Sequence, residues 1–167
     1  MWSQHHGPDV KVRDVMAKDV KTLRETDTVR AAARQLAEHR IGGMPVVDGS
    51  GTLVGILTEL DVLEALKTQH KKLRMLMPPE ISFGISFVQV MEEREATLAF
   101  EEIGDRPVSG IMTTDVAAVA PDDAIEHAIQ LMVQRKVHRL PVAEGGKVVG
   151  ILTRGDVLRG FFRSLVE

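Results

Sequence analysis

The stretch Val137-His138-Arg139-Leu140-Pro141-Val142, continued by Gly150-Ile151-Leu152-Thr153-Arg154-Gly155-Asp156, decides the fold of this chain. It is typical of a strand, a tight turn, a second strand and the start of a helix. Thr153 and Asp156 would then lie at a helix N-terminus, where free N–H groups and a partial positive charge favour anions. The pattern occurs once before, as Ile41-Gly42-Gly43-Met44-Pro45-Val46 and Gly55-Ile56-Leu57-Thr58-Glu59-Leu60-Asp61. This recurrence predicts a chain built from two like copies.

The repeat extends beyond this stretch, and its offset changes only inside a turn. Met16 and Met112 are 112 − 16 = 96 positions apart, whereas Gly55 and Gly150 are 150 − 55 = 95 apart. The first-copy turn, 48–51, is one residue longer than the second-copy turn. Insertions of this kind are tolerated best in surface turns.

Each copy shows the same order of local signals. A short extended piece (20–23 or 116–119) precedes a helix whose N-cap we expect at Thr26 or Asp122. Apolar residues at i, i+3, i+4 and i+7 give that helix one buried face. Two β-branched runs around a glycine turn predict a hairpin, and a second helix follows. We therefore expect an α/β (α+β) fold of two β-α-β-β-α motifs, packed sheet to sheet as a pseudo-two-fold pair.

The repeat also sets the expected boundaries: an N-terminal arm over 1–9, motif 1 over 10–66, a helical connector over 67–106 and motif 2 over 107–167. We interpret the arm as a flexible tail rather than a metal site at His5 and His6. In the connector, Pro78-Pro79 should end a helix after Met77, and another helix is expected over 87–103. The basic start and acidic end of this segment suit either a solvated connector or a surface for a protein partner.

Composition excludes several classes of protein. The chain is 44% hydrophobic and 27% charged, which is ordinary for a globular protein, and its net charge of −3 gives no reason to expect nucleic-acid binding. It has no cysteine, so disulfides and thiolate sites are impossible, and its few aromatics offer no base-stacking platform. We expect no metal site, no membrane span and a cytoplasmic location, since the chain shows neither a long apolar run nor a signal-like start.

The two copies resemble CBS motifs, and the whole chain is similar to a tandem CBS pair, or Bateman module. The resemblance rests on the paired Val-x-x-x-Met openings, the Pro-Val strands and the twice-occurring Gly-Ile-Leu-Thr-x-x-Asp. It implies a non-catalytic regulatory module with no required cofactor. Such a module binds adenosine-containing ligands, here of the AMP, ADP or ATP type, in clefts between the motifs. It also implies a homodimer that passes a conformational change to a protein target in trans.

The resemblance further implies roles for individual residues. The Asp of Thr-x-x-Asp would accept hydrogen bonds from the ribose hydroxyls, and the Thr would meet the ribose or a phosphate. Backbone near each Pro and on each opening strand would read the adenine, and basic side chains would bind phosphate. The implied second-copy site consists of Val116, Val137, His138, Arg139, Leu140, Pro141, Thr153, Arg154 and Asp156. The implied first-copy site, which we expect to be weaker, consists of Val20, Gly42, Gly43, Met44, Pro45, Thr58 and Asp61.

Thr-x-x-Asp also has a purely structural interpretation, because it matches a helix capping box. The two interpretations are compatible, since a capped helix start is also a seat for an anion. The copies should nevertheless differ in their ligands. The second copy has basic residues where the first has glycines and an acid: His138, Arg139 and Arg154 are equivalent to Gly42, Gly43 and Glu59. We therefore expect the phosphorylated nucleotide in the second copy. The first-copy site would be empty or hold an uncharged adenosyl group.

Three alternatives remain open from the sequence alone. One is a binder of S-adenosylmethionine or NAD. Another is a small nucleotide-processing enzyme, against which the chain shows no nucleophile beside a base and no Walker-type phosphate loop. The last is a nucleic-acid-binding protein, supported only by the basic cluster at 67–74.

Overall fold

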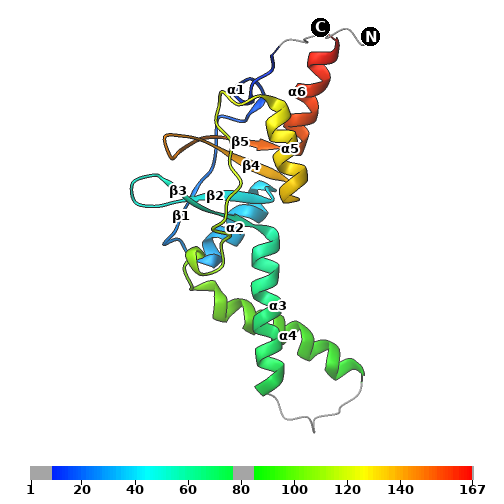
Figure 1. Cartoon of the computed structure of the whole chain (residues 1–167). Coiled ribbons are helices and arrows are strands. Elements are labelled where there is room, and N and C mark those ends of the chain that lie inside the picture. The colour runs from blue at the N-terminus through cyan, green and yellow to red at the C-terminus, as the bar shows by residue number, and fades with distance from the viewer. Residues whose placement is uncertain (1–8, 77–84, 167) are drawn as a thin grey trace. The chain divides into compact units, whose positions relative to one another are not determined.

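The computed structural model describes the backbone of residues 9–76 and 85–166, and the side chains of residues 9–69 and 94–163. The expected mixed α/β class is confirmed (Figure 1). The elements are α1 (Val12–Val15), β1 (Leu23–Arg24), α2 (Val29–His39), β2 (Gly43–Val47), β3 (Leu53–Thr58), α3 (Glu59–Leu76), α4 (Ile85–Gly104), the 3-10 turn η1 (Val108–Gly110), α5 (Ile125–Arg135), β4 (Arg139–Glu144), β5 (Lys147–Thr153) and α6 (Arg154–Val166).

The chain forms two compact units, each of which combines segments from both copies. The second-copy unit contains α1, β4, β5, α5 and α6, together with the first-copy turn at 47–54. The first-copy unit contains β1, most of β2 and β3, and α2, α3, α4 and η1. Each copy of the repeat therefore lends its opening segment to the unit built around the other.

The sheets are smaller than the sequence predicts. The first copy has three strands in the order β1-β2-β3, and its β1 is only two residues long. The second copy has the antiparallel pair β4-β5, with Arg139 opposite Thr153 and Leu140 opposite Leu152. The third strand expected at 116–119 is reduced to one parallel bridge between Val119 and Val142.

Both expected N-caps are wrong by two residues. Helix α2 is capped by Thr28, whose hydroxyl accepts the Ala31 N–H at 3.2 Å, and not by Thr26. In the second copy the N-cap position is Ala124, which has no capping side chain, and not Asp122. The acidic residue just before each cap explains the displacement. The carboxylates of Asp27 and Asp123 accept N–H groups three residues back and fold the chain into a turn before the helix starts. Asp122 instead forms an ion pair with Arg13 at 2.6 Å.

The exchanged openings are built into the cores of the two units. Val12, fully buried, packs in the second-copy core with Leu140 and Leu152, and Val108 is fully buried in the first-copy unit. Ala17 exchanges two backbone hydrogen bonds with Ile151, at 2.9 and 3.0 Å, and Thr113 exchanges two with Ile56, both at 2.9 Å. Through these bonds each opening pairs with one strand of a hairpin, β5 in the second copy and β3 in the first.

The glycine of each Gly-Ile-Leu-Thr is required by this exchange. A Cβ on Gly150 would lie 2.6 Å from the sulfur of Met16, and a Cβ on Gly55 would lie 2.6 Å from the sulfur of Met112. The methionine of each opening thus packs over the glycine of the opposite copy. This explains why the two residue types recur together in the repeat.

The connector is helical, as expected. Its first helix is continuous with the second helix of motif 1, as α3, which runs to Leu76, and α4 spans Ile85–Gly104 rather than 87–103. The end of α4 docks on the first copy, because Ala99 and Ile103 are buried and Arg30 lies 5.3 Å from the Phe100 ring centroid. In Figure 1, α3 and α4 lie against each other. The arm with His5 and His6, the break at Met77–Pro79 and the side chains of the basic cluster at 70–74 lie outside the described residues.

Candidate functional site

In the second copy, Thr153 and Asp156 form a complete capping box at the start of α6. Oδ2 of Asp156 accepts the Thr153 N–H at 2.9 Å and the Thr153 hydroxyl at 2.8 Å. In return the Asp156 N–H donates to the Thr153 hydroxyl oxygen at 3.3 Å. The Asp156 side chain keeps 15% of its surface exposed. The structural interpretation of Thr-x-x-Asp therefore holds, and the box holds the carboxylate in a fixed orientation.

The first copy repeats this box at the start of α3. Oδ2 of Asp61 accepts the Thr58 N–H at 2.8 Å and the Thr58 hydroxyl at 3.0 Å, and the Asp61 N–H donates to that hydroxyl at 3.2 Å. In both copies one carboxylate oxygen is thus used by the cap. The second oxygen, Oδ1, is the atom through which the two sites differ.

Oδ1 of each aspartate meets a residue that the sequence analysis did not identify. Oδ1 of Asp156 forms an ion pair with Nη2 of Arg159 at 2.5 Å, whereas Oδ1 of Asp61 accepts the Thr113 hydroxyl at 3.1 Å. Arg159 could have been found from its i+3 position on the same helix. Thr113 could not, because it reaches Asp61 only through the exchange of openings.

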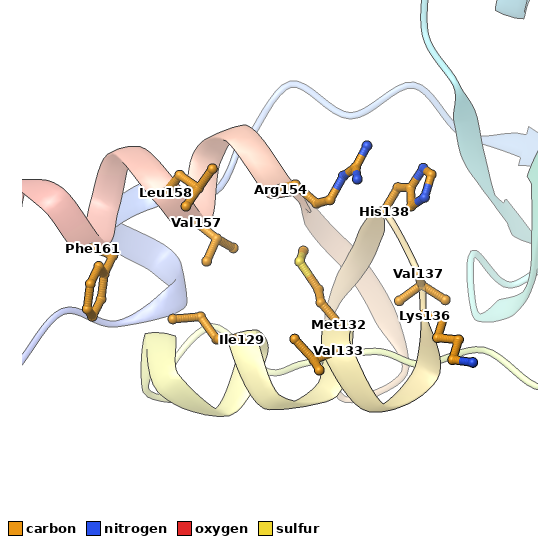
Figure 2. A pocket seen from close by; sticks show the side chains of 10 residues that line it. All are labelled: Ile129, Met132, Val133, Lys136, Val137, His138, Arg154, Val157, Leu158 and Phe161. Carbon is orange, nitrogen blue, oxygen red and sulfur yellow. The ribbon is translucent and has the colours of Figure 1, made fainter.

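The predicted basic residues lie at the same end of the second-copy unit as the capping box. The Arg154 N–H donates to the His138 carbonyl at 3.2 Å, which joins the start of β4 to the start of α6. The side chains of His138 and Arg154 are exposed and lie beside each other (Figure 2), and Arg139 is half-buried. In the first copy the Glu59 N–H donates to the Gly42 carbonyl at 3.0 Å. The backbone link is therefore the same, but two basic side chains are replaced by a glycine and an acid.

A cavity of about 570 Å³ adjoins these residues between α5 and α6. In Figure 2, His138 and Arg154 lie at one end and Phe161 at the other. The wall between them is mostly apolar and includes Met132 and Val157, which are almost fully buried. Neither Thr153 nor Asp156 lines this cavity, which therefore adjoins the capping box without including it.

The remaining predicted residues divide between walls and supports. Val137 lines the cavity and Val116 is half-buried in the same unit. Five predicted residues are buried, so only their backbone groups could contact a ligand. They are Gly43, Met44 and Pro45 in the first copy and Leu140 and Pro141 in the second. Val20, the equivalent of Val116, lies just before β1, and its grouping with Thr58 and Asp61 stays a prediction.

Neither a metal site nor a membrane span is found in the part of the chain that the structure describes. No group of three or more His, Cys, Asp or Glu side chains there could hold a metal ion. Nor is any helix there long and apolar enough to cross a membrane.

The family model for the CBS domain matches this chain twice, at residues 12–68 and 108–163. The chain belongs to the CBS-domain family. Both matches begin at the openings whose exchange builds the two units, and both include a Thr-x-x-Asp box. The resemblance to a tandem CBS pair is therefore confirmed.

Individual CBS-domain proteins are similar to most of the chain. The CBS domain-containing protein YhcV of Bacillus subtilis is 30% identical over 146 residues, which cover 87% of this chain and 81% of YhcV. The crystal structure of CBSX2 in complex with AMP superposes with a TM-score of 0.67 at 26% identity, covering 92% of this chain and 96% of that one. The CBS domain pair of protein MJ0100, in complex with 5′-methylthioadenosine and S-adenosyl-L-methionine, gives a TM-score of 0.68 at 25% identity, covering 93% and 98%.

Proposed function

We propose that this CBS pair is a non-catalytic regulatory module whose second-copy site binds an adenine nucleotide of the AMP, ADP or ATP type. The observation that carries the proposal is the Asp156 carboxylate, held by the Thr153 box beside His138 and Arg154. The AMP and S-adenosylmethionine complexes of similar CBS proteins support an adenosine-containing ligand. The phosphate preference comes from the basic residues of this chain.

Each part of the nucleotide has a suitable counterpart in the second copy. Asp156 accepts hydrogen bonds from the ribose hydroxyls, since a carboxylate is a charged acceptor without donors. Thr153 lies beside the ribose or a phosphate, and His138, Arg139 and Arg154 bind phosphate oxygens at the N-terminus of α6. Backbone groups of Leu140 and Pro141 read the adenine, with Val116 and Val137 as apolar walls.

The first-copy site suits a different adenosyl ligand. Thr58 and Asp61 retain the ribose-binding pair, and Gly42 and Gly43 leave the start of β2 without side chains. Glu59 and Glu64 stand where the second copy has Arg154 and Arg159, and their charge opposes a phosphate. We propose that this site is empty or takes an uncharged adenosyl group, as in 5′-methylthioadenosine.

The module would relay ligand binding to a protein in trans as a homodimer. The second-copy unit exposes Val133 and Leu158 at the cavity between α5 and α6, and Phe162 further along α6, while α3 exposes Leu60 and Leu63. The rim of the first surface is basic and that of the second is acidic, through Glu59 and Glu64. This complementarity favours a dimer in which α3 of one chain packs on α5 and α6 of another. Sedimentation of Leu158→Glu as a monomer would support this arrangement, and an unchanged dimer would contradict it.

Calorimetric titration of AMP, ADP, ATP, S-adenosylmethionine and NAD tests the function. We expect the phosphorylated adenosines to bind. Asp156→Asn should lower the affinity for AMP at least about tenfold, because a hydrogen bond to a charged acceptor contributes roughly 1.5–3 kcal/mol. Asp61→Asn is the matched control and should leave AMP affinity within about twofold. Equal losses in the two variants, or no binding of any adenosine compound, would overturn the proposal. A nucleotide-hydrolysis assay that shows turnover would contradict its non-catalytic part.

A further inference from the structure

The Asp156 carboxylate that we propose as the ribose acceptor already has a cationic partner. Nη2 of Arg159 lies 2.5 Å from Oδ1, the oxygen that the capping box leaves over. The Arg159 side chain is 67% exposed, whereas that of Asp156 is 15% exposed. The guanidinium therefore contacts the carboxylate at the protein surface, through the oxygen that a ribose hydroxyl would need as its acceptor.

The neighbouring residue makes room for this ion pair. A Cβ on Gly155 would lie 3.2 Å from Nη1 of Arg159 and within 4 Å of two further guanidinium atoms. Position 155 is equivalent to Leu60, and position 159 to Glu64, at the offset of 95. Gly155 and Arg159 thus occur together in the second copy, and both are replaced in the first. There, Oδ1 of Asp61 meets the neutral Thr113 instead.

This pairing affects charged and uncharged ligands differently. An adenosine that takes Oδ1 must separate Arg159 from its carboxylate, and it offers the guanidinium no anion in exchange. A nucleotide brings its own phosphate, and the exposed Arg159 side chain is free to rotate from the carboxylate to that phosphate. Arginine suits this exchange because its planar fork binds carboxylate and phosphate with similar geometry.

We propose that Arg159 is a specificity-determining residue that makes the second-copy site select phosphorylated adenosines over uncharged ones. The inference rests on the proposed function of that site and adds a second effect to it. Arg159 attracts the phosphate, and it also excludes nucleosides that cannot replace Asp156 as its partner. The first-copy site has Glu64 in place of Arg159 and so lacks this ion pair, in agreement with its proposed uncharged ligand.

The test is the ratio of the dissociation constants of adenosine and AMP, measured by calorimetry on the full chain. In Arg159→Gln we expect the dissociation constant of AMP to rise about tenfold and that of adenosine to fall about threefold. The ratio of the adenosine constant to the AMP constant then falls roughly thirtyfold. Tighter adenosine binding is the decisive result, because general damage to the site would weaken both ligands. Arg163→Gln, one turn further along α6, removes the same charge away from Asp156 and should leave the ratio within about twofold.

Each outcome separates the inference from the function on which it rests. An Arg159→Gln ratio equal to that of the unmodified chain, or equal losses for AMP and adenosine, would overturn the inference alone. Failure of the unmodified chain to bind AMP would overturn the proposed function and the inference together. Urea denaturation of Arg159→Gln verifies folding. If that variant is unstable, Arg159→Lys, which keeps the charge but loses the fork, should still lower the ratio, and an unchanged ratio would count against the proposal.

Discussion

The two copies of this CBS pair share one scaffold and differ in the groups that face their proposed ligands. Both have the Thr-x-x-Asp box, the buried Pro-Val strand and a methionine packed on a glycine. Around the aspartate, however, the second copy has His138, Arg154 and Arg159, where the first has Gly42, Glu59 and Glu64. The repeat thus preserves the residues that hold the carboxylate and changes the charge of the residues at the neighbouring positions.

The strongest test of the shared scaffold is truncation of the exchanged openings. Val12 and Val108 are both fully buried, one in each unit. Val12→Ala and Val108→Ala should each lower the free energy of unfolding by about 2 kcal/mol, from lost transfer energy and the cavity left behind. Urea denaturation measures the effect, and Glu38→Ala, at an exposed residue of α2, is the control. A large loss in only one of the two buried variants would show that the openings are not equivalent.

A somewhat smaller effect is expected at the glycines under the methionines. Gly150→Ala and Gly55→Ala should each cost about 1–2 kcal/mol, because the added Cβ meets a methionine sulfur and a backbone carbonyl oxygen. Gly49→Ala is the control, since a Cβ there would have no atom within 4 Å. Near-neutral thermal stability in both test variants would mean that the openings move aside readily, and the scaffold comparison would lose its basis.

Exchange of charge between the sites sharpens the comparison of ligands. Arg154→Glu copies the first site into the second and should weaken AMP about tenfold, because an attractive charge becomes repulsive. Glu59→Arg makes the reverse change and should strengthen any AMP binding at the first copy. Calorimetry resolves both effects, and both should shrink at higher salt. Arg34→Glu, an exposed change on α2, is the control. An AMP affinity that Arg154→Glu leaves intact would remove the electrostatic basis of the asymmetry.

The smallest expected effect concerns Oδ1 of Asp61. Thr113→Ala removes the hydroxyl that donates to this oxygen and reproduces Ala17, the equivalent residue of the second unit. The loss in stability should be about 0.5 kcal/mol, since the hydrogen bond is solvent-exposed. Ala17→Thr is the reciprocal variant and should be close to neutral. A loss above about 2 kcal/mol in Thr113→Ala would assign to this bond a structural role far beyond a typical exposed hydrogen bond.

Much of the fold could be predicted from the sequence because the same local signals occur in both copies of the repeat. The hairpins, the first helix of each copy and the Thr-x-x-Asp box depend on residues close in sequence, such as Thr153 and Asp156. The predicted N-caps lie two residues too early because Asp27 and Asp123, each directly after a predicted cap, fold the chain into a turn that delays the start of the helix. Local signals that conflict within three residues are not resolved by residue preference alone.

The composition of each site was harder to predict because it depends on pairing between distant segments. Nothing local indicates that Ala17 pairs with Ile151, or Thr113 with Ile56. Sequence order therefore gives no sign that Thr113 lies beside Asp61. Arg159 was missed for a different reason. Its i+3 spacing from Asp156 on one helix is a local signal for an ion pair, and the sequence-based assignment of the site did not use that signal.

The exchange of openings has a consequence for dividing this chain. A cut in the connector would give two fragments, each with one complete repeat and neither with a complete core. The N-terminal fragment would carry Val12 without Leu140 and Leu152, and the C-terminal fragment would carry Val108 without its partners. Neither fragment should fold alone, but a mixture of the two should recover the native state by complementation.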